Sequence, residues 1–331
     1  LRLLTGGFAP ISLEELNSKA EMMSRIDNKY VVDRWALERI LPALLEEFDI
    51  LEIDDRRAFT YDTRYFDDPD CSAYYEHHQG LRKGFKVRVR RYSDAGLCFL
   101  EVKVKGKRGM TVKNRQSYDP ADLGELTPEA FDYAKGVYTG HYDKAFDYDL
   151  RPALDIEYQR ITLVAKEGGE RMTIDGKLSF RNEKKRLEAP NDVFIVETKS
   201  ALGRGYADKA LRAVHARPTK KCSKYCIGMA ALGAVSRWNR FMPTMRMLRL
   251  VTGTKPALPP PVLPPAPSMP QPAQPLARAP PPSLTPARRP APPPQPPAPP
   301  STPRRGPTRD PRPGPRRQIK GLRRGPMGQR K

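Results

Sequence analysis

Charged side chains recur at every second position in several separate stretches of the chain. The clearest stretch carries Lys86, Arg88 and Arg90 with valines between them, and residues 101–105 alternate in the same way. A period of two is β-strand geometry, so the charges lie on one face of each strand and the valines on the other. Like charges that face each other across strands repel. A face that gathers so many cations needs water or an anion, which is the strongest indication of function in the sequence.

Carboxylates occur within the same alternating pattern. Glu101 stands two residues before Lys103, and Glu197 stands two residues before Lys199. Arginine makes bidentate contacts with phosphate oxygens, and lysine supplies a point charge. One or two carboxylates suffice to hold Mg²⁺ or Mn²⁺, which keeps its other positions for water and phosphate. The combination predicts a phosphate site with a bound divalent metal, whereas an ordinary solvent-facing sheet would mix the two signs.

Other routes to nucleotide or metal chemistry are absent from the sequence. There is no GxxxxGK[ST] loop, no GxGxxG after a strand and no kinase HRD or DFG motif. The four cysteines form no CxxC pair, which favours reduced cytosolic thiols over a metal site. The four histidines are scattered and lack zinc-ligand spacing. Any phosphate chemistry must therefore come from a cage of side chains.

Composition divides the chain into two parts. Residues 255–331 hold 28 of the 37 prolines and 15 Lys and Arg against one acid, Asp310. This tail lacks the aromatic and β-branched residues that offset chain entropy, so we expect residues 251–331 to be disordered. Its arginine pairs could bind polyanions. Residues 1–250 have the length and apolar content of a single domain.

The chain shows neither a membrane-spanning segment nor a signal peptide. No run of 18 apolar residues exists, and the first residues lack a charged region followed by an apolar stretch. We therefore expect a cytoplasmic protein, or one peripheral to the inner membrane. Because the first residue is leucine, we expect the natural N-terminus to be missing or processed.

The local patterns predict mostly antiparallel strands with helices around them. We expect strands at 29–32, 49–54, 58–66, 85–92, 97–105, 111–118, 153–165, 170–180 and 192–199. Turns at 93–96 and 106–109 make three of these strands a meander. Helices are predicted at 33–48, 128–137, 206–215 and 222–236. About eight strands tend to curl or close into a barrel, so the expected fold is an α+β protein with an eight-stranded antiparallel tunnel.

Eight motifs stand in the order of a known family. They are RIDNKY (25–30), YDTRYFDD (61–68), KVRVRRY (86–92), FLEVKVK (99–105), LDIEYQR (154–160), RMTID (171–175), VETK (196–199) and KKCSKYCIG (220–228). Together they resemble the VTC domain, the polyphosphate polymerase domain of the vacuolar transporter chaperone complex, which is part of the CYTH-like superfamily of triphosphate tunnel metalloenzymes. The resemblance covers residues 10–240 and is to the smaller bacterial members.

The resemblance implies a tunnel that binds triphosphate or polyphosphate, with roles assigned by motif position. Glu197 would be the metal ligand, with Glu101 as a second carboxylate. The catalytic cations would be Lys29, Arg88, Arg90, Lys103, Arg160 and Arg171. Substrate-binding residues would be Lys113, Tyr158, Lys199, Lys221, Ser223, Lys224 and Arg82.

One departure from the superfamily concerns its opening ExExK signature. This chain has Arg25, Asp27 and Lys29 at those positions, so the first acid is a base and the second is shorter. Fewer carboxylates hold fewer metal ions. The change argues against hydrolysis by a water activated between two metals, and toward transfer or binding.

The predicted function is therefore a polyphosphate polymerase that passes the γ-phosphate of an NTP, with ATP preferred, to a growing chain with the help of Mn²⁺ or Mg²⁺. Alternatives are a triphosphate hydrolase on the same tunnel and a protein that binds polyphosphate without turnover. The expected partners are NTP, polyphosphate and a membrane protein that receives the product. Nucleic acid is not expected as the main partner, because no RNA-type aromatic motif is present.

Overall fold

The computed structural model describes residues 4–19, 25–106 and 110–251. Its strands are β1 (Pro10–Ile11), β2 (Ile26–Asp33), β3 (Phe48–Leu51), β4 (Phe59–Asp67), β5 (Phe85–Tyr92), β6 (Leu97–Lys105), β7 (Thr111–Ser117), β8 (Arg151–Ala165), β9 (Arg171–Arg181), β10 (Arg186–Glu188) and β11 (Val193–Ser200). Its α-helices are α1 (Leu13–Lys19), α2 (Arg34–Glu47), α3 (Ser72–Gln79), α4 (Pro128–Tyr142), α5 (Tyr206–Ala213), α6 (Lys224–Ala231) and α7 (Met242–Met247).

Eight strands form one hydrogen-bonded antiparallel path in the order β2-β11-β9-β8-β4-β5-β6-β7. The short strands attach to this path, with β10 on β9, β3 on β8 and β1 on β3. The predicted α+β class, antiparallel tunnel sheet and peripheral helices are confirmed. Among the described residues the end strands β2 and β7 do not pair with each other, so hydrogen bonds do not close the sheet.

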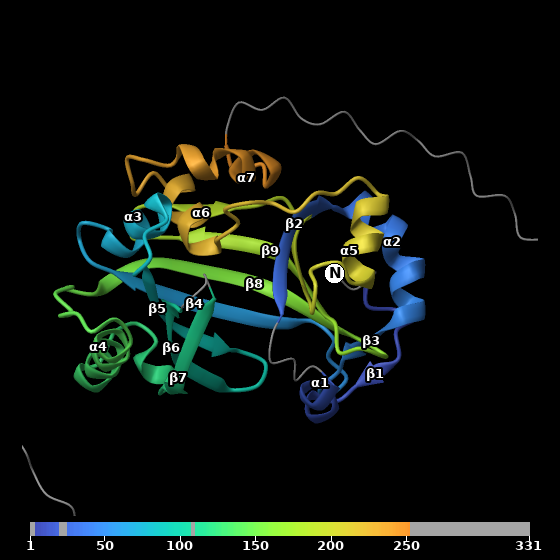
Figure 1. Ribbon diagram of the computed structural model, residues 1–331, viewed down its shortest axis with the longest axis horizontal. Coiled ribbons are helices and arrows are strands. Elements are labelled where there is room, and N and C mark those ends of the chain that lie inside the picture. The colour runs from blue at the N-terminus through green and yellow to red at the C-terminus, as the bar shows by residue number, and fades with distance from the viewer. Residues whose placement is uncertain (1–3, 20–24, 107–109, 252–331) are drawn as a thin grey trace, which may run out of the picture. The chain divides into compact units, whose positions relative to one another are not determined.

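Helices cover the outer face of the sheet at both ends (Figure 1). Toward β2, helices α2 and α5 pack on alternate apolar residues of β2, β11, β9 and β8, among them Val32, Ile174 and Val196. Toward β7, helix α4 packs on the valines of β5 and β6. The alternation that places these residues outside places the charged ones inside.

Helix α6 lies on the inner face, where one end of the sheet is apolar. Its residues share a core with Leu154 of β8 and Phe180 of β9, and α3 and α7 lie beside it (Figure 1). A Cβ at Gly228 would approach both of these side chains to 2.7 Å, so the close approach of helix and sheet requires glycine. The helix therefore delivers its first residues to the border between the apolar and the charged inner surface.

Local capping signals explain where the first helices begin. Asp33 accepts a hydrogen bond from the Ala36 amide at 2.9 Å and starts α2, as predicted. Ser12 and Glu15 form a reciprocal cap at the start of α1. Pro42 lies inside the single helix α2 and does not divide it.

Asp67 connects β4, α3 and α6 through hydrogen bonds, so we expect its substitution to lower the stability of the protein. Its buried carboxylate accepts hydrogen bonds from the Ala73 and Tyr74 amides at 2.9 and 3.0 Å and from the Tyr225 hydroxyl. Asp67→Asn puts an amide donor among these donors, so the free energy of unfolding should fall by about 1–3 kcal/mol. Urea unfolding measures this change in free energy, and Asp70→Asn, at an exposed position, is the control. An equal effect of both substitutions would contradict this role.

Two predictions fall partly or wholly outside the described residues. The predicted turn at 106–109 includes undescribed positions, and the proline-rich tail lies beyond residue 251. The domain boundary at residue 250 stays a prediction, because the residues after 251 lie outside the described part of the chain. No helix among the described residues has both the length and the apolar character needed to cross a membrane.

Candidate functional site

The register of the sheet brings the alternating charges together on the inner face. Opposite pairs include Lys29 with Glu197, Arg160 with Asp175 and Arg88 with Glu101. The inner cations of the eight strands are Lys29, Lys86, Arg88, Arg90, Lys103, Lys105, Lys113, Arg115, Arg160, Arg171 and Lys199. The carboxylates on the same face are Asp27, Glu101, Asp175 and Glu197. The cations outnumber the acids, as the period of two predicts.

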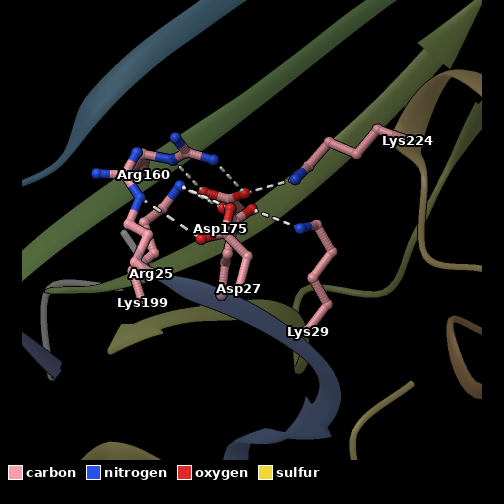
Figure 2. A network of polar contacts seen from close by, with 8 residues as sticks. Arg25, Asp27, Lys29, Arg160, Asp175, Lys199 and Lys224 are labelled. Atoms are coloured by element: carbon pink, nitrogen blue, oxygen red, sulfur yellow. Dashed lines mark hydrogen bonds and ion pairs between the residues drawn. The ribbon is translucent and has the colours of Figure 1, made fainter. Parts of the chain in front are cut away.

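Glu197 is held between two lysines at the β2 side of the face. Its Oε2 lies 3.1 Å from Lys29 Nζ, and its Oε1 lies 2.5 Å from Lys199 Nζ. Lys199 Nζ also reaches Asp27 Oδ2 at 3.4 Å, and Asp27 in turn faces Arg25 (Figure 2). Burial alone would raise the pKa of Glu197, but Lys29 and Lys199 hold it well below its ordinary value. Glu197 is therefore a charged carboxylate in a basic setting.

Asp175 fixes two further cations in the middle of the face. Arg160 Nε and Nη2 donate to its two oxygens at 2.6 and 2.8 Å, and Lys224 Nζ from the start of α6 reaches Oδ2 at 2.5 Å (Figure 2). The Asp175 side chain is 1 % exposed. Burial would raise its pKa, but Arg160 and Lys224 lower it. Bidentate geometry holds the Arg160 guanidinium in one orientation.

Glu101 likewise holds two cations in place, on the side of the inner face that is nearer to β7. It accepts from Arg88 Nε at 2.7 Å and lies 3.2 Å from Lys113 Nζ. Arg88 also donates to the Tyr65 hydroxyl at 2.8 Å. Burial would raise the pKa of Glu101, but Arg88 and its neighbouring cations Arg90 and Lys113 hold it below its ordinary range. Glu101 is fully buried, so it serves to orient cations that other groups can contact.

Lys103 stands between these clusters without a partner of its own. In the described part of the chain it makes no hydrogen bond or ion pair, and its strand neighbours are Lys86 and Lys113. Arg88, then burial and Arg90, lower the pKa of Lys103 well below its ordinary value. Its charge interacts with Glu197 as well as Glu101, although four strands separate β6 from β11 in the path.

Two more polar groups on β9 lack partners. Arg171 Nε and Thr173 Oγ1 are buried and make no hydrogen bond in the described structure. They lie opposite Lys199 and Glu197 on β11. Burial, then Arg25, lowers the pKa of Arg171. Buried donors are normally satisfied, so this surface has the chemistry of a site that an anion completes.

Stacked tyrosines position the remaining cations. Tyr61 and Tyr158 stack with their ring centres 5.1 Å apart. The Arg90 and Arg160 guanidiniums lie 5.3 and 5.0 Å from the Tyr61 ring, and Lys224 Nζ lies 4.7 Å from the Tyr158 ring. A ring face attracts a cation without neutralising its charge. The cations thus remain available to phosphate.

The structure brings the predicted residues together with two exceptions, Arg82 and Lys221, and among the described residues Lys221 makes no hydrogen bond or ion pair. Arg82 is exposed in the loop after α3 and, among the described residues, makes no hydrogen bond or ion pair. Ser223 caps α6 and accepts from Lys86 Nζ at 2.9 Å. Residues that the sequence did not assign to the site are Asp27, Tyr61, Lys86, Asp175 and Thr173. Asp175 and Thr173 follow the same alternation, which was the available signal, whereas Tyr61 carries no charge to reveal it.

A comparison with models of known protein families shows which family the chain belongs to. The model of the VTC domain matches residues 24–233, which span the described sheet from β2 to α6. This chain belongs to the VTC domain family. The predicted resemblance is confirmed, and the VTC domain of this chain carries every inner-face residue described above.

Solved structures with a similar fold have low sequence identity to this VTC protein. A protein of Pyrococcus horikoshii is 14 % identical, covering 61 % of this chain and 96 % of that one, with a TM-score of 0.35. A putative adenylate cyclase of Bacillus halodurans is 12 % identical, covering 60 % of this chain and 95 % of that one, with a TM-score of 0.40. A putative adenylyl cyclase of Hippeastrum with a dominant triphosphatase activity is 14 % identical, covering 62 % of this chain and 95 % of that one, with a TM-score of 0.37. No curated protein matches the chain.

The carboxylates of the VTC domain limit how a metal could be held. The described residues contain no group of three His, Cys, Asp or Glu side chains that could form a complete site. Glu197 fits a single-carboxylate site, because 17 % of its side chain is exposed and Mg²⁺ accepts phosphate and water as further ligands. Both oxygens of the buried Glu101 are taken by Arg88 and Lys113. Its assignment as a second metal ligand stays a prediction.

Proposed function

We propose that this VTC protein binds the triphosphate of an NTP on the inner face and transfers the γ-phosphate to a growing polyphosphate chain. The observation that carries this proposal is a group of donors without partners in the described structure: the half-buried ammonium of Lys103 and the buried Arg171 Nε and Thr173 Oγ1. Buried cations without counter-ions are costly. The oxygens of a triphosphate or polyphosphate, spread along several phosphates, can satisfy donors that come from different strands.

The reaction needs positioning and charge neutralisation rather than a side-chain nucleophile. A terminal oxygen of phosphate or polyphosphate attacks the γ-phosphorus, the bond to the β–γ bridging oxygen breaks, and nucleoside diphosphate leaves with that oxygen. In our proposal Arg88, Arg90 and Arg160 contact the phosphates, because Glu101, Asp175 and the tyrosines already fix their orientation. Lys103 adds positive charge where the phosphates gather, and a bound triphosphate would raise its lowered pKa again.

Glu197 is the proposed ligand of the divalent metal, Mn²⁺ or Mg²⁺. When bound, such an ion neutralises charge on the phosphate oxygens. The chain's own contribution is that Lys29 and Lys199 release the carboxylate and move to phosphate. Because the described residues hold no group of three carboxylate, histidine or cysteine side chains that could bind a metal, the arrangement favours transfer over hydrolysis by a water held between two metals.

Glu197→Gln tests both the activity and the role of the carboxylate. We expect the full-length protein with ATP and Mn²⁺ to make a ladder of polyphosphate on a stained gel, and the variant to be slower by about 10²-fold because one charge-stabilising group is lost. Glu188→Gln, an exposed glutamate paired only with Arg186, is the matched control. Orthophosphate as the product would establish the hydrolase, and tight tripolyphosphate binding with neither product would establish a binding protein.

A further inference from the structure

An apolar surface is exposed on the loop of residues 201–205, which connects β11 to α5. Leu202 in this loop is 78 % exposed, more than any other large apolar side chain that the structure describes. Ile26 and Tyr206, which flank the loop, are 49 % and 50 % exposed. We call this surface the 202 patch: Ile26, Leu202 and Tyr206 with the cations Arg25, Arg204 and Arg212. Exposed apolar residues that lie together, rather than scattered singly, indicate an interaction surface.

The loop is held in place by the fold beneath it. The buried Asp208 carboxylate accepts hydrogen bonds from the Gly205 amide at 3.2 Å and from Asn28 Nδ2 at 2.9 Å. Asn28 Nδ2 also donates to the Gly203 carbonyl at 3.0 Å. A Cβ at Gly203 would come within 2.8 Å of Ile26 Cγ2, so the loop lies directly against the start of β2. Because the residues on both sides of its neighbour are fixed in this way, Leu202 is presented to solvent by a built scaffold.

Cations surround these apolar side chains. Arg204 is exposed and makes no hydrogen bond or ion pair with the residues that the structure describes. Arg212 Nη2 donates to the Gly203 carbonyl at 3.5 Å. Arg25 Nε lies 3.6 Å from Asp27 Oδ1 (Figure 2), and an exposed pair at this distance contributes little. The patch therefore combines an apolar tip with positive charge.

The acids near the loop do not offset this charge. Glu170 is buried under the start of α5, where it accepts hydrogen bonds from the Tyr206 and Ala207 amides at 2.7 and 3.1 Å. Glu46 and Glu47 of α2 line a groove between α2 and α5 that reaches Tyr206 but includes neither the loop nor its arginines. A partner that covers the 202 patch should consequently be anionic as well as able to take up an apolar side chain.

The surface of an anionic bilayer meets both requirements. A side chain that is 78 % exposed projects from the protein, so Leu202 can enter the boundary between headgroups and acyl chains without a preformed groove. Arginines next to it attract anionic headgroups, and a tyrosine is favoured at the level of the headgroups. We propose that the 202 patch docks the protein on a membrane rich in anionic phospholipid, with Leu202 inserted. Because Ile26 pairs with Ser200 at the ends of β2 and β11, docking would place this end of the inner face beside the bilayer.

A tryptophan at the tip of the loop tests insertion in the full-length protein. Vesicles of phosphatidylglycerol and phosphatidylcholine that carry bromine on the acyl chains quench an indole that enters them. We expect these vesicles to quench most of the emission that Leu202→Trp adds to that of Trp35 and Trp238. Leu81→Trp, at an exposed leucine beside α3, is the control and should stay unquenched. Equal quenching of both variants, or of neither, would overturn the proposal.

The comparison of two probes also deals with the basic residues 255–331. Any attraction of vesicles by these residues acts on both variants alike, so only the difference between positions 202 and 81 reports on the patch. Binding that survives about 0.5 M NaCl, where exposed charges are screened, should be lost in Leu202→Ser. Survival of that binding in the serine variant would contradict insertion of the leucine.

Single charge substitutions measure the contribution of the arginines. Arg204→Gln should weaken binding to vesicles with phosphatidylglycerol about fivefold at low salt, because one cation near the surface is lost. Arg246→Gln, at an exposed arginine of α7, removes the same charge away from the patch and should leave the affinity unchanged. The same loss in both variants would show that only net charge matters, and would overturn the site.

A second copy of this chain is the competing occupant of the 202 patch. Sedimentation velocity of the wild type and Leu202→Ser distinguishes it from the membrane. A concentration-dependent dimer that the serine variant loses, without quenching at position 202, would overturn membrane docking. All these measurements are made without nucleotide, so their outcome is independent of whether the protein makes polyphosphate.

Discussion

Arg160→Met is expected to lower phosphate transfer by about 10³-fold and the free energy of unfolding by about 3 kcal/mol. Arg160 is the bidentate partner of Asp175 and lies over the Tyr61 ring. Methionine removes the guanidinium that we assign to the triphosphate. It also leaves a buried carboxylate, 1 % exposed, with Lys224 as its remaining ion pair. Both losses follow from one side chain because the same guanidinium holds the fold and faces the ligand.

Companion variants separate the two effects. Arg160→Lys keeps the charge but loses the bidentate geometry, so it should keep more stability than activity. Arg160→Met combined with Asp175→Asn removes the carboxylate charge that has lost its bidentate partner but also the counter-ion of Lys224, so only part of the stability should return while transfer stays low. Urea unfolding and the rate of polyphosphate formation measure them. If the double variant recovered transfer as well, Arg160 would act only by neutralising Asp175.

The alternation of charges predicted the inner face because a strand leaves little freedom in side-chain direction. Strands β5 and β6 have the predicted bounds, and the residues at 86, 88 and 90 face inward as expected. Asp33 likewise marked the start of α2 through a local cap. Such features depend on neighbours in the sequence, which a period or a cap expresses directly.

Features that depend on distant segments could not be read in the same way. The carboxylates of Glu101 and Glu197 look alike in sequence, yet one is fully buried against Arg88 and the other lies between two lysines. The role of Asp175 appears only when α6 returns Lys224 to β9 from 49 residues further along the chain. Helix α7 and strand β10 are short and carry no clear period, so they were not predicted.

Lys103→Met is expected to stabilise the protein while lowering phosphate transfer by about 10³-fold. Lys103 is half-buried among cations, and Arg88, then burial and Arg90, lower its pKa well below the ordinary value. Methionine has a similar volume and no charge, so replacing the lysine should raise the free energy of unfolding by about 1–2 kcal/mol. Urea unfolding measures the expected gain in stability, and the rate of polyphosphate formation measures the expected loss of transfer. Lys19→Met, at a lysine paired with Asp49 away from the inner face, is the control.

The same lysine predicts how binding depends on pH. Because the pKa of Lys103 is lower in the folded protein than in the unfolded chain, the unfolded chain binds more protons between these two values, and stability rises with pH across that window. A bound triphosphate attracts the proton back, so its affinity should fall as pH rises through the same window. Calorimetry in buffers of different ionisation enthalpy should show proton uptake by the wild type and less by Lys103→Met. Equal uptake by both proteins would place the titrating group elsewhere and leave Lys103 a permanently charged contact.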